Sequence, residues 1–152
     1  MATVSNQLSL RRQTLGAMLY LAKARFVVRF FAFSRWRGSL GRLLETSGDQ
    51  ARSSPPPDLD ATSQSEARAL ARRVERAANR LPGESKCLPK AMALQWMMQR
   101  AGLPSRLVIA IHRHERASND TYHAWVEVSQ EMLIGHCDRS EYAGVAGFDQ
   151  FG

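Results

Sequence analysis

The chain lacks the patterns that mark a secreted or membrane-spanning protein. Its 152 residues contain two cysteines, too few for the disulfide framework of a small secreted domain. Its first residues do not read as a secretory signal. The apolar stretch at 15–33 is interrupted by Lys23, Arg25 and Arg29, and a charge near mid-membrane costs about 2.5–3.5 kcal/mol. We therefore expect a reduced, cytoplasmic protein without a transmembrane helix.

Two kinds of functional motif are also missing. The sequence has no Gly-rich phosphate loop, so it does not indicate ATP use. Residue types that could collect a zinc ion are present, but no C-x-x-C or H-x-x-x-H spacing supports such a site. These residues are Cys87, His123, His136 and Cys137. Zinc binding is therefore the weaker interpretation of these side chains, and we expect no cofactor.

Positive charge is concentrated in the N-terminal third of the chain. The formal net charge is +7; residues 1–57 hold nine Lys/Arg against two Asp/Glu, whereas 58–152 hold twelve of each kind. Such asymmetry favours an acidic partner, nucleic acid or a membrane surface. A basic helix face exposed to solvent would show the same charges.

Residues 1–45 are predicted to form a basic, amphipathic helical segment. Between 8 and 33 apolar side chains recur at helical spacing, and a short second helix is expected around Trp36, Leu40 and Leu43. The predicted apolar stripe consists of Leu15, Met18, Leu19, Ala22, Phe26 and Phe30. This stripe could dock on the chain's own core, on a partner protein or on a membrane surface.

A Pro/Ser-rich linker over 46–62 separates this segment from a core at 63–152. The first core helix is predicted at 63–80, where Ser63 and Glu66 have the spacing of a capping box. Its expected inner stripe is Ala67, Leu70, Ala71, Val74 and Ala78, and its outer stripe is Arg68, Arg72, Arg76 and Arg80.

The rest of the core is predicted to be one helix followed by strands. The helix at 87–101 ends at Gly102, a good C-cap residue. The apolar period then changes to that of strands at 107–111, 122–128 and 131–135. A polar turn is predicted at 115–120 and a tight turn at Ser129 and Gln130. Helices followed by antiparallel strands define an α+β fold.

The residue with the clearest chemical promise is Cys87, which lies where a loop becomes a helix. The first N–H groups of a helix have no partners within the helix and stabilise an anion. A thiolate is favoured there, and Lys86 and Lys90 add positive charge. Pro89 suits a first helical turn. Taken alone, Cys87 could equally be a buried, inert thiol.

His123 supplies the group that a thiol nucleophile needs. It begins a strand, next to Trp125, on the strand face expected to look toward the helix. A neutral imidazole can accept the thiol proton and later protonate a leaving amine. A purely structural histidine is the alternative.

With these residues in view, the chain resembles the transglutaminase-like core. The resemblance rests on CLPKAMALQWMMQRAGLPSRLVIAI at 87–111 and YHAWVEV at 122–128. More narrowly, it is similar to the B2 proteins of lasso peptide biosynthesis. The resemblance implies a papain-like cysteine protease core with its nucleophile at a helix N-terminus on a small antiparallel sheet, preceded here by N-terminal helices.

The same resemblance implies a function and partners. Such proteins remove the leader from a ribosomally made precursor peptide, and a separate cyclase then closes the ring. Because this chain has only helix and linker before 63, it looks like the split form. Its partners would be the precursor, a separate winged-helix leader-recognition protein and the cyclase; no nucleic acid is expected.

The third catalytic residue departs from the family pattern. The family commonly supplies an Asp after the His strand to orient the imidazole. Asp138 is the nearest Asp here, a little beyond the matching position, and it is our predicted third member. His136 and Glu127 are the alternatives.

Two competing functions stay open. In one, the fold has lost turnover and only presents a precursor peptide to partner proteins. In the other, the same thiol chemistry transfers the acyl group to an amine instead of to water. A reactive thiol separates the enzymes from the binding module.

Overall fold

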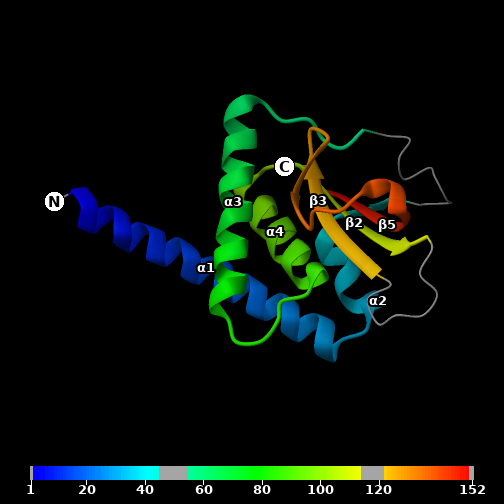
Figure 1. Cartoon of the computed structure of the whole chain (residues 1–152), viewed down its shortest axis with the longest axis horizontal. Helices are drawn as coiled ribbons and strands as arrows, with labels where there is room; N and C mark the ends of the chain where they lie inside the picture. The colour runs from blue at the N-terminus through cyan, green and yellow to red at the C-terminus, as the bar shows by residue number, and fades with distance from the viewer. Residues whose placement is uncertain (1, 45–54, 114–121, 151–152) are drawn as a thin grey trace.

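The long helices pack in a layer against an antiparallel sheet (Figure 1). The computed structural model describes residues 2–44, 55–113 and 122–150, with side chains from residue 11 onward. Helix α4 (Cys87–Ala101) lies against the sheet, and α1 (Ala2–Phe30) and α3 (Ala61–Arg80) pack on α4 and on each other. The other elements are α2 (Phe33–Trp36), the 3-10 helix η1 (Arg37–Leu40), β1 (Arg42–Leu44), β2 (Ser105–His112), β3 (Tyr122–Val128), β4 (Glu131–Ile134), the 3-10 helix η3 (Arg139–Glu141) and β5 (Tyr142–Gln150).

In the described part of the chain the sheet has five strands in the order β1-β5-β2-β3-β4, all antiparallel neighbours. This α+β arrangement confirms the predicted fold class. The predicted tight turn at Ser129 and Gln130 joins β3 to β4, with positive φ angles of 44° and 65°. Strand β5 had no counterpart among the predicted elements, because its two glycines weaken the apolar alternation of YAGVAGFDQ.

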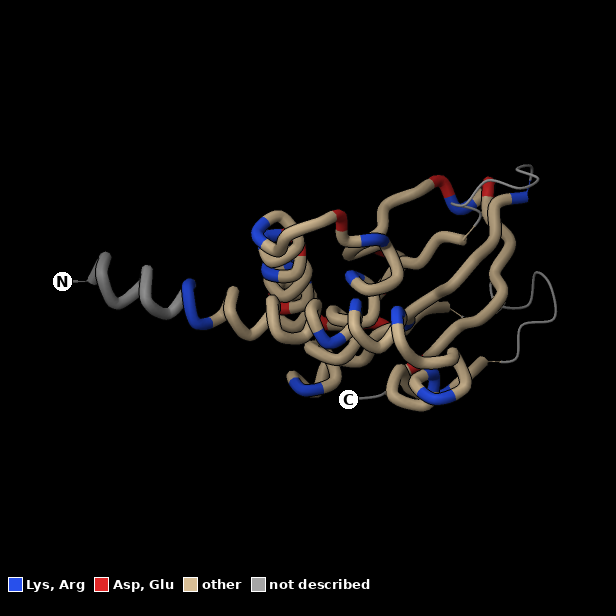
Figure 2. Tube along the Cα trace, turned by 90° about the horizontal axis from the view of Figure 1, so that it is seen from below, with Lys and Arg blue, Asp and Glu red and all other residues tan. Residues whose placement is uncertain are grey.

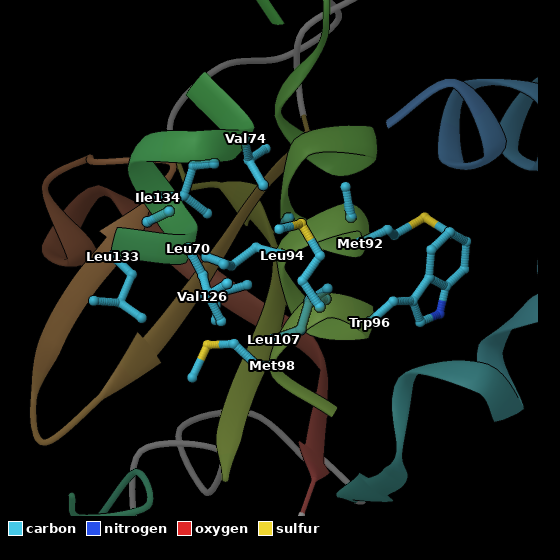
Figure 3. Packing of buried hydrophobic residues seen from close by; sticks show 14 of the residues in the cluster. Leu70, Val74, Met92, Leu94, Trp96, Met98, Leu107, Val126, Leu133 and Ile134 are labelled. Atoms are coloured by element: carbon cyan, nitrogen blue, oxygen red, sulfur yellow. The ribbon is translucent and has the colours of Figure 1, made fainter. Parts of the chain in front are cut away.

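Helix α4 is the centre of the core. Its side chains are buried continuously from Ala91 to Met98, as expected for a helix covered on all sides. It ends as predicted at Gly102, whose φ of 69° is left-handed. Figure 3 shows the packing around it, where side chains from α3, α4 and three strands meet. The labelled members are Leu70, Val74, Met92, Leu94, Trp96, Met98, Leu107, Val126, Leu133 and Ile134.

One buried polar side chain ties α4 to three other elements. The Gln95 amide nitrogen donates to the carbonyl oxygens of Leu40 and Phe148, at 2.9 and 3.1 Å. Its amide oxygen accepts from Ser105 Oγ at 2.8 Å. A buried amide whose nitrogen and oxygen are both hydrogen-bonded stabilises one arrangement of its neighbours. Gln95 therefore fixes how η1, β5 and β2 sit around α4.

Helix α1 docks on the chain's own core, but through a different face from the predicted stripe. The side chains it buries are Leu21 and three small ones, Thr14, Ala17 and Ala24. Five residues of the predicted stripe are instead exposed: Ala22 and the four large side chains Leu15 at 57%, Leu19 at 73%, Phe26 at 54% and Phe30 at 67%. Small side chains allow α1 to approach α3 and α4 closely, which the bulky stripe would prevent. An apolar face of α1 is thus left open.

The first core helix differs from the prediction at its start and on one face. It begins at Ala61 with Asp60 as N-cap, because the Asp60 carboxylate accepts the Ser63 N–H at 2.7 Å; Ser63 is not the cap. That bond lowers the pKa of Asp60. Ala77 rather than Ala78 completes the buried stripe. Residues 115–120, predicted as a polar turn, lie outside the described residues.

The N-terminal segment and the predicted core share one hydrophobic cluster in the described residues. Ala17 and Leu21 of α1 belong to the same cluster as α3, α4 and the sheet. Leu43, predicted on a helix, is on β1, which pairs with β5. The register places Arg42 opposite Asp149.

A buried ion pair joins two central strands. Arg106 on β2 faces Asp149 on β5, and its Nε and Nη2 donate to the two carboxylate oxygens at 2.6 and 2.9 Å. Only 3% and 8% of the two side chains are exposed. The hydrogen bonds to Asp149 raise the pKa of Arg106. Because the pair is bidentate and desolvated, each partner depends on the other.

We predict that Asp149→Asn destabilises the fold by about 3–5 kcal/mol, because it leaves a buried guanidinium without its counter-charge. Urea denaturation followed by circular dichroism measures the loss. Glu131→Gln is the matched control. It breaks the exposed ion pair with Arg68, whose side chains are 47% and 35% exposed, and solvent screening makes its cost much smaller. Equal losses of unfolding free energy in the two variants would contradict the stabilising role of the buried Arg106–Asp149 pair.

Candidate active site

Cys87 is the first residue of α4, as predicted from the sequence. The preceding Lys86 is extended, with φ −64° and ψ 162°, and no described side chain caps the helix there. The first N–H groups of α4 are therefore available to an anion. Pro89 lies in the first turn and is buried, where a missing N–H costs no helical hydrogen bond. The thiol itself is partly buried.

The thiol faces the beginning of β3. Cys87 Sγ lies 4.0 Å from the carbonyl oxygen of Tyr122, the residue before His123. Strand β4 pairs with β3 only from Val126 to Val128. The start of β3 is therefore an edge not covered by β4, and α4 begins beside it.

His123 is held by a backbone carbonyl. Its Nε2 lies 2.8 Å from the carbonyl oxygen of Gly135. A carbonyl can only accept, so Nε2 is the protonated nitrogen in this arrangement. The other ring nitrogen, Nδ1, is then the one that can accept a proton from a thiol. A single hydrogen bond thus selects the tautomer that a base requires.

Aromatic rings pack around the imidazole on one face of the sheet. The ring centroid of His123 lies 5.3 Å from that of Tyr142 and 6.3 Å from that of Trp125. The opposite-facing residues of β3, Ala124 and Val126, pack into the core with α4. Contrary to our prediction, His123 therefore does not face the body of α4, because small and aliphatic side chains fill that space. Only the start of the helix, at Cys87, lies beside the end of β3 that carries His123. His123 instead lies on the opposite face of the sheet, where a second hydrophobic cluster contains Val108, Ala110 and Trp125, with Tyr142 packed against it.

Gly135 makes the bond to His123 possible. Its φ is 76°, a conformation that favours glycine. A Cβ at this position would collide with the Ala124 carbonyl oxygen and come within 3.0 Å of Trp125 Cα. The chain can therefore pass this close to β3 only because residue 135 has no side chain.

The structure uses Asp138 differently from our prediction. Its carboxylate accepts from Ser140 N at 2.9 Å and Ser140 Oγ at 2.7 Å, capping η3. The Ser140 hydrogen bonds lower the pKa of Asp138, and the residue is exposed. The hydrogen bond seen at His123 is accepted by the carbonyl oxygen of Gly135. No contact between Asp138 and His123 supports the predicted orienting role.

Glu127 and His136, the two alternatives for orienting His123, contact other groups. Glu127 accepts from Trp125 Nε1 at 2.9 Å and pairs with Arg139 at 2.8 Å. His136 is exposed and contributes, after Arg68 and Gln64, to lowering the pKa of Glu131.

The charges expected beside Cys87 are unequal. Lys90 is paired with Glu75, its Nζ lying 3.2 Å from both carboxylate oxygens, so its charge is largely balanced. Lys86 is exposed and forms no ion pair with a described residue.

The second thiol, Cys137, packs near Trp125 and Tyr142, and burial raises its pKa. Cys137 is therefore the less reactive candidate.

Two features of the site were missed by sequence reasoning. Tyr142 belongs to the unpredicted strand β5. Gly135 precedes Asp138 by three residues, and the sequence carries no acidic side chain between them; a main-chain carbonyl is not visible as a candidate in residue types. No group of three potential metal ligands occurs among the residues that the structure describes.

The comparisons with known proteins agree with this architecture. A family model of the transglutaminase-like superfamily matches residues 27–146. The chain therefore belongs to the transglutaminase-like superfamily, which includes cysteine peptidases and transglutaminases. None of the curated proteins and none of the solved structures matched the chain. Within the described residues, no helix is long and apolar enough to span a membrane.

We predict that His123→Ala slows alkylation of Cys87 by iodoacetamide about tenfold or more at pH 7, because no imidazole then accepts the thiol proton. The rate is followed by mass spectrometry in a Cys137→Ser background, which leaves one thiol to label. His136→Ala is the control and is expected to label normally, since this histidine is exposed. An unchanged rate in His123→Ala would mean that the imidazole does not assist Cys87.

Proposed function

We propose that this protein is a cysteine peptidase that removes the leader from a ribosomally made precursor peptide during lasso peptide maturation. One observation is central to the proposal. Cys87, at a helix start without a side-chain cap, faces the strand that carries His123. The hydrogen bond from His123 Nε2 leaves Nδ1 without a proton, so that Nδ1 can accept one. Membership of the transglutaminase-like superfamily supports thiol chemistry, and the resemblance of 87–111 and 122–128 to leader peptidases supports the substrate.

The chemistry would run through an acyl-enzyme. The Cys87 thiolate attacks the scissile carbonyl carbon, and the C–N bond breaks as the acyl group is transferred to sulfur. The first N–H groups of α4 stabilise the oxyanion. His123 receives the thiol proton at Nδ1 and delivers it to the leaving amine. It then removes a proton from water, which hydrolyses the thioester and frees Cys87.

The Gly135 carbonyl would orient His123 throughout this cycle. It accepts from Nε2–H whether the ring is neutral or protonated, so the ring need not turn between steps. A neutral carbonyl stabilises imidazolium less than a carboxylate does. This difference is what favours the second candidate, a catalytically weak module that presents a precursor peptide to its partners.

We predict that Cys87→Ala lowers kcat/KM for precursor cleavage at least about a thousandfold, because the nucleophile is lost. The substrate is a short precursor peptide encoded beside the gene, incubated with its recognition protein and analysed by mass spectrometry. An unchanged circular dichroism spectrum and melting curve show that the fold is intact. Normal cleavage by this variant would refute the peptidase assignment.

Matched variants divide the roles of the other residues. Cys137→Ser should retain activity, and His123→Ala should lose about a hundredfold or more. Asp138→Ala should cost little, because its carboxylate caps η3. A loss in Asp138→Ala as large as in His123→Ala would return the orienting role to Asp138. No cleavage by the native chain, with an alkylatable Cys87, would favour the presenting module.

The proposed partner is a separate winged-helix leader-recognition protein, and the lasso cyclase would act next on the freed core peptide. Support comes from α1, which has five Lys/Arg and no Asp or Glu (Figure 2). Its N-terminal part projects from the rest of the fold (Figure 1). On the solvent side of the same helix, Leu15 and Leu19 are exposed, as are Arg11 and Arg12, so apolar area and positive charge occur together.

We predict that Arg11→Glu combined with Leu19→Ser weakens binding of the recognition protein about tenfold, and that salt weakens the native complex. Titration calorimetry at low and high salt measures both effects. Arg72→Glu, an exposed change on α3, is the control for net charge. Affinity that responds to neither the variant nor salt would mean that this part of α1 is not the contact surface.

A further inference from the structure

A groove lies between the C-terminal half of α1 and the start of α4. It has a volume of about 600 Å³, within the range of ligand-binding sites. One wall contains Phe26, Arg29 and Phe30 of α1, and the other contains Glu84, Lys86 and Pro89. The loop from α3 to α4 passes close to α1 along this wall (Figure 1).

The groove is next to the proposed nucleophile. Lys86 immediately precedes Cys87, and Pro89 lies in the same first turn of α4. Residues 86 and 89, three positions apart, lie on the same side of this turn. Cys87 lies on the adjoining side. An extended chain that crosses the helix start would therefore pass from the groove to the thiol.

The groove is preformed, because its two walls are joined at one end. Arg25 Nη1 on α1 donates to the Pro82 carbonyl oxygen at 2.8 Å. The next residue, Gly83, has a φ of 78°, and an added Cβ would lie 2.9 Å from Arg25 Nη2. Glycine thus permits the close approach of the loop to α1.

The α1 wall is an exposed aromatic surface. Phe26 and Phe30 are 54% and 67% exposed, and their ring centroids are 4.8 Å apart. Phe31, 41% exposed, lies 6.0 Å from Phe26. Three neighbouring phenylalanines in solvent mark a binding surface rather than scattered apolar residues.

The charges around the groove favour an anionic ligand. Arg29 and Lys86 are exposed cations on opposite walls, and neither has an ion-pair partner in the described part of the chain. Arg25 is a third cation, used to hold the loop. Glu84 is the one acidic residue of the lining. A ligand combining carboxylates with apolar side chains matches this surface.

We propose that this groove binds the peptide substrate through a segment that alternates acidic and apolar side chains, a few residues from the scissile bond. This inference rests on the proposed function, since it names the substrate class of the same site. Apolar side chains contact the phenylalanines, and carboxylates pair with Arg29 and Lys86. A concave site with Glu84 on one wall fits a peptide better than a flat anionic membrane, which would repel that carboxylate.

The test is binding of two synthetic ten-residue peptides with a neutral dye, measured by fluorescence anisotropy at low salt. One alternates Glu with Phe and Leu, and the other has Lys in place of each Glu. The protein is the full-length Cys87→Ala variant, so that binding is measured without turnover. We expect the acidic peptide to bind at least about tenfold more tightly. Adding Arg29→Glu should weaken it about tenfold.

Arg72→Glu is the matched control, the same charge reversal at an exposed position on α3 outside the groove, and should change affinity less than about twofold. Phe30→Ala should weaken both peptides. Equal binding of the two peptides, or equal losses in Arg29→Glu and Arg72→Glu, would overturn the proposal. So would loss of co-sedimentation with anionic phospholipid vesicles in Arg29→Glu with unchanged peptide affinity. Because binding is scored without catalysis, failure of the peptidase assignment leaves this result readable on its own.

Discussion

The burial of α4 is the constraint on which the rest of the structure depends. A helix with buried side chains over eight consecutive positions must be covered on every side, by α1 and α3 on one flank and by the sheet on the other. Its one buried amide, Gln95, is satisfied by groups from η1, β5 and β2. The position of the helix start, and of Cys87 with it, follows from this packing rather than from the loop before it.

The imidazole illustrates how a backbone group can take a role usually given to a side chain. Orientation requires an acceptor at one fixed place, and a carbonyl in a left-handed turn supplies it as well as a carboxylate does. The two differ in charge. A carboxylate stabilises imidazolium strongly, whereas the Gly135 carbonyl only fixes the tautomer and ring position. The local chemistry is therefore that of a positioned base with little added electrostatic stabilisation.

Helix α1 has one face that packs on the core and another that is exposed to solvent. The face with Thr14, Ala17 and Ala24 is small enough for close packing against α3 and α4. The bulky face is left to solvent, with the positive charges interleaved. Such an exposed apolar and basic surface costs solubility unless something covers it. Its two ends differ, since the N-terminal part projects freely and the C-terminal part forms a wall of the groove beside α4.

Much of the fold and half of the site could be read from local sequence. Capping, periodicity and turn chemistry predicted five features of the fold. They are the start of α4 at Cys87, its end at Gly102, the strands containing Leu107 and His123, and the turn at Ser129. These are properties of neighbouring residues, so one chain suffices to predict them.

Only the tertiary structure decided the contacts between distant residues. The choice of the small face of α1, the pairing of β5 with β1 and β2, and the use of Gly135 at His123 each depend on which surfaces meet. The reason is physical. Close packing selects the side chains that fit, and a hydrogen bond needs an acceptor in one direction at about 3 Å. Neither condition is visible in spacing along the chain, which is why Asp138 seemed the better partner from sequence.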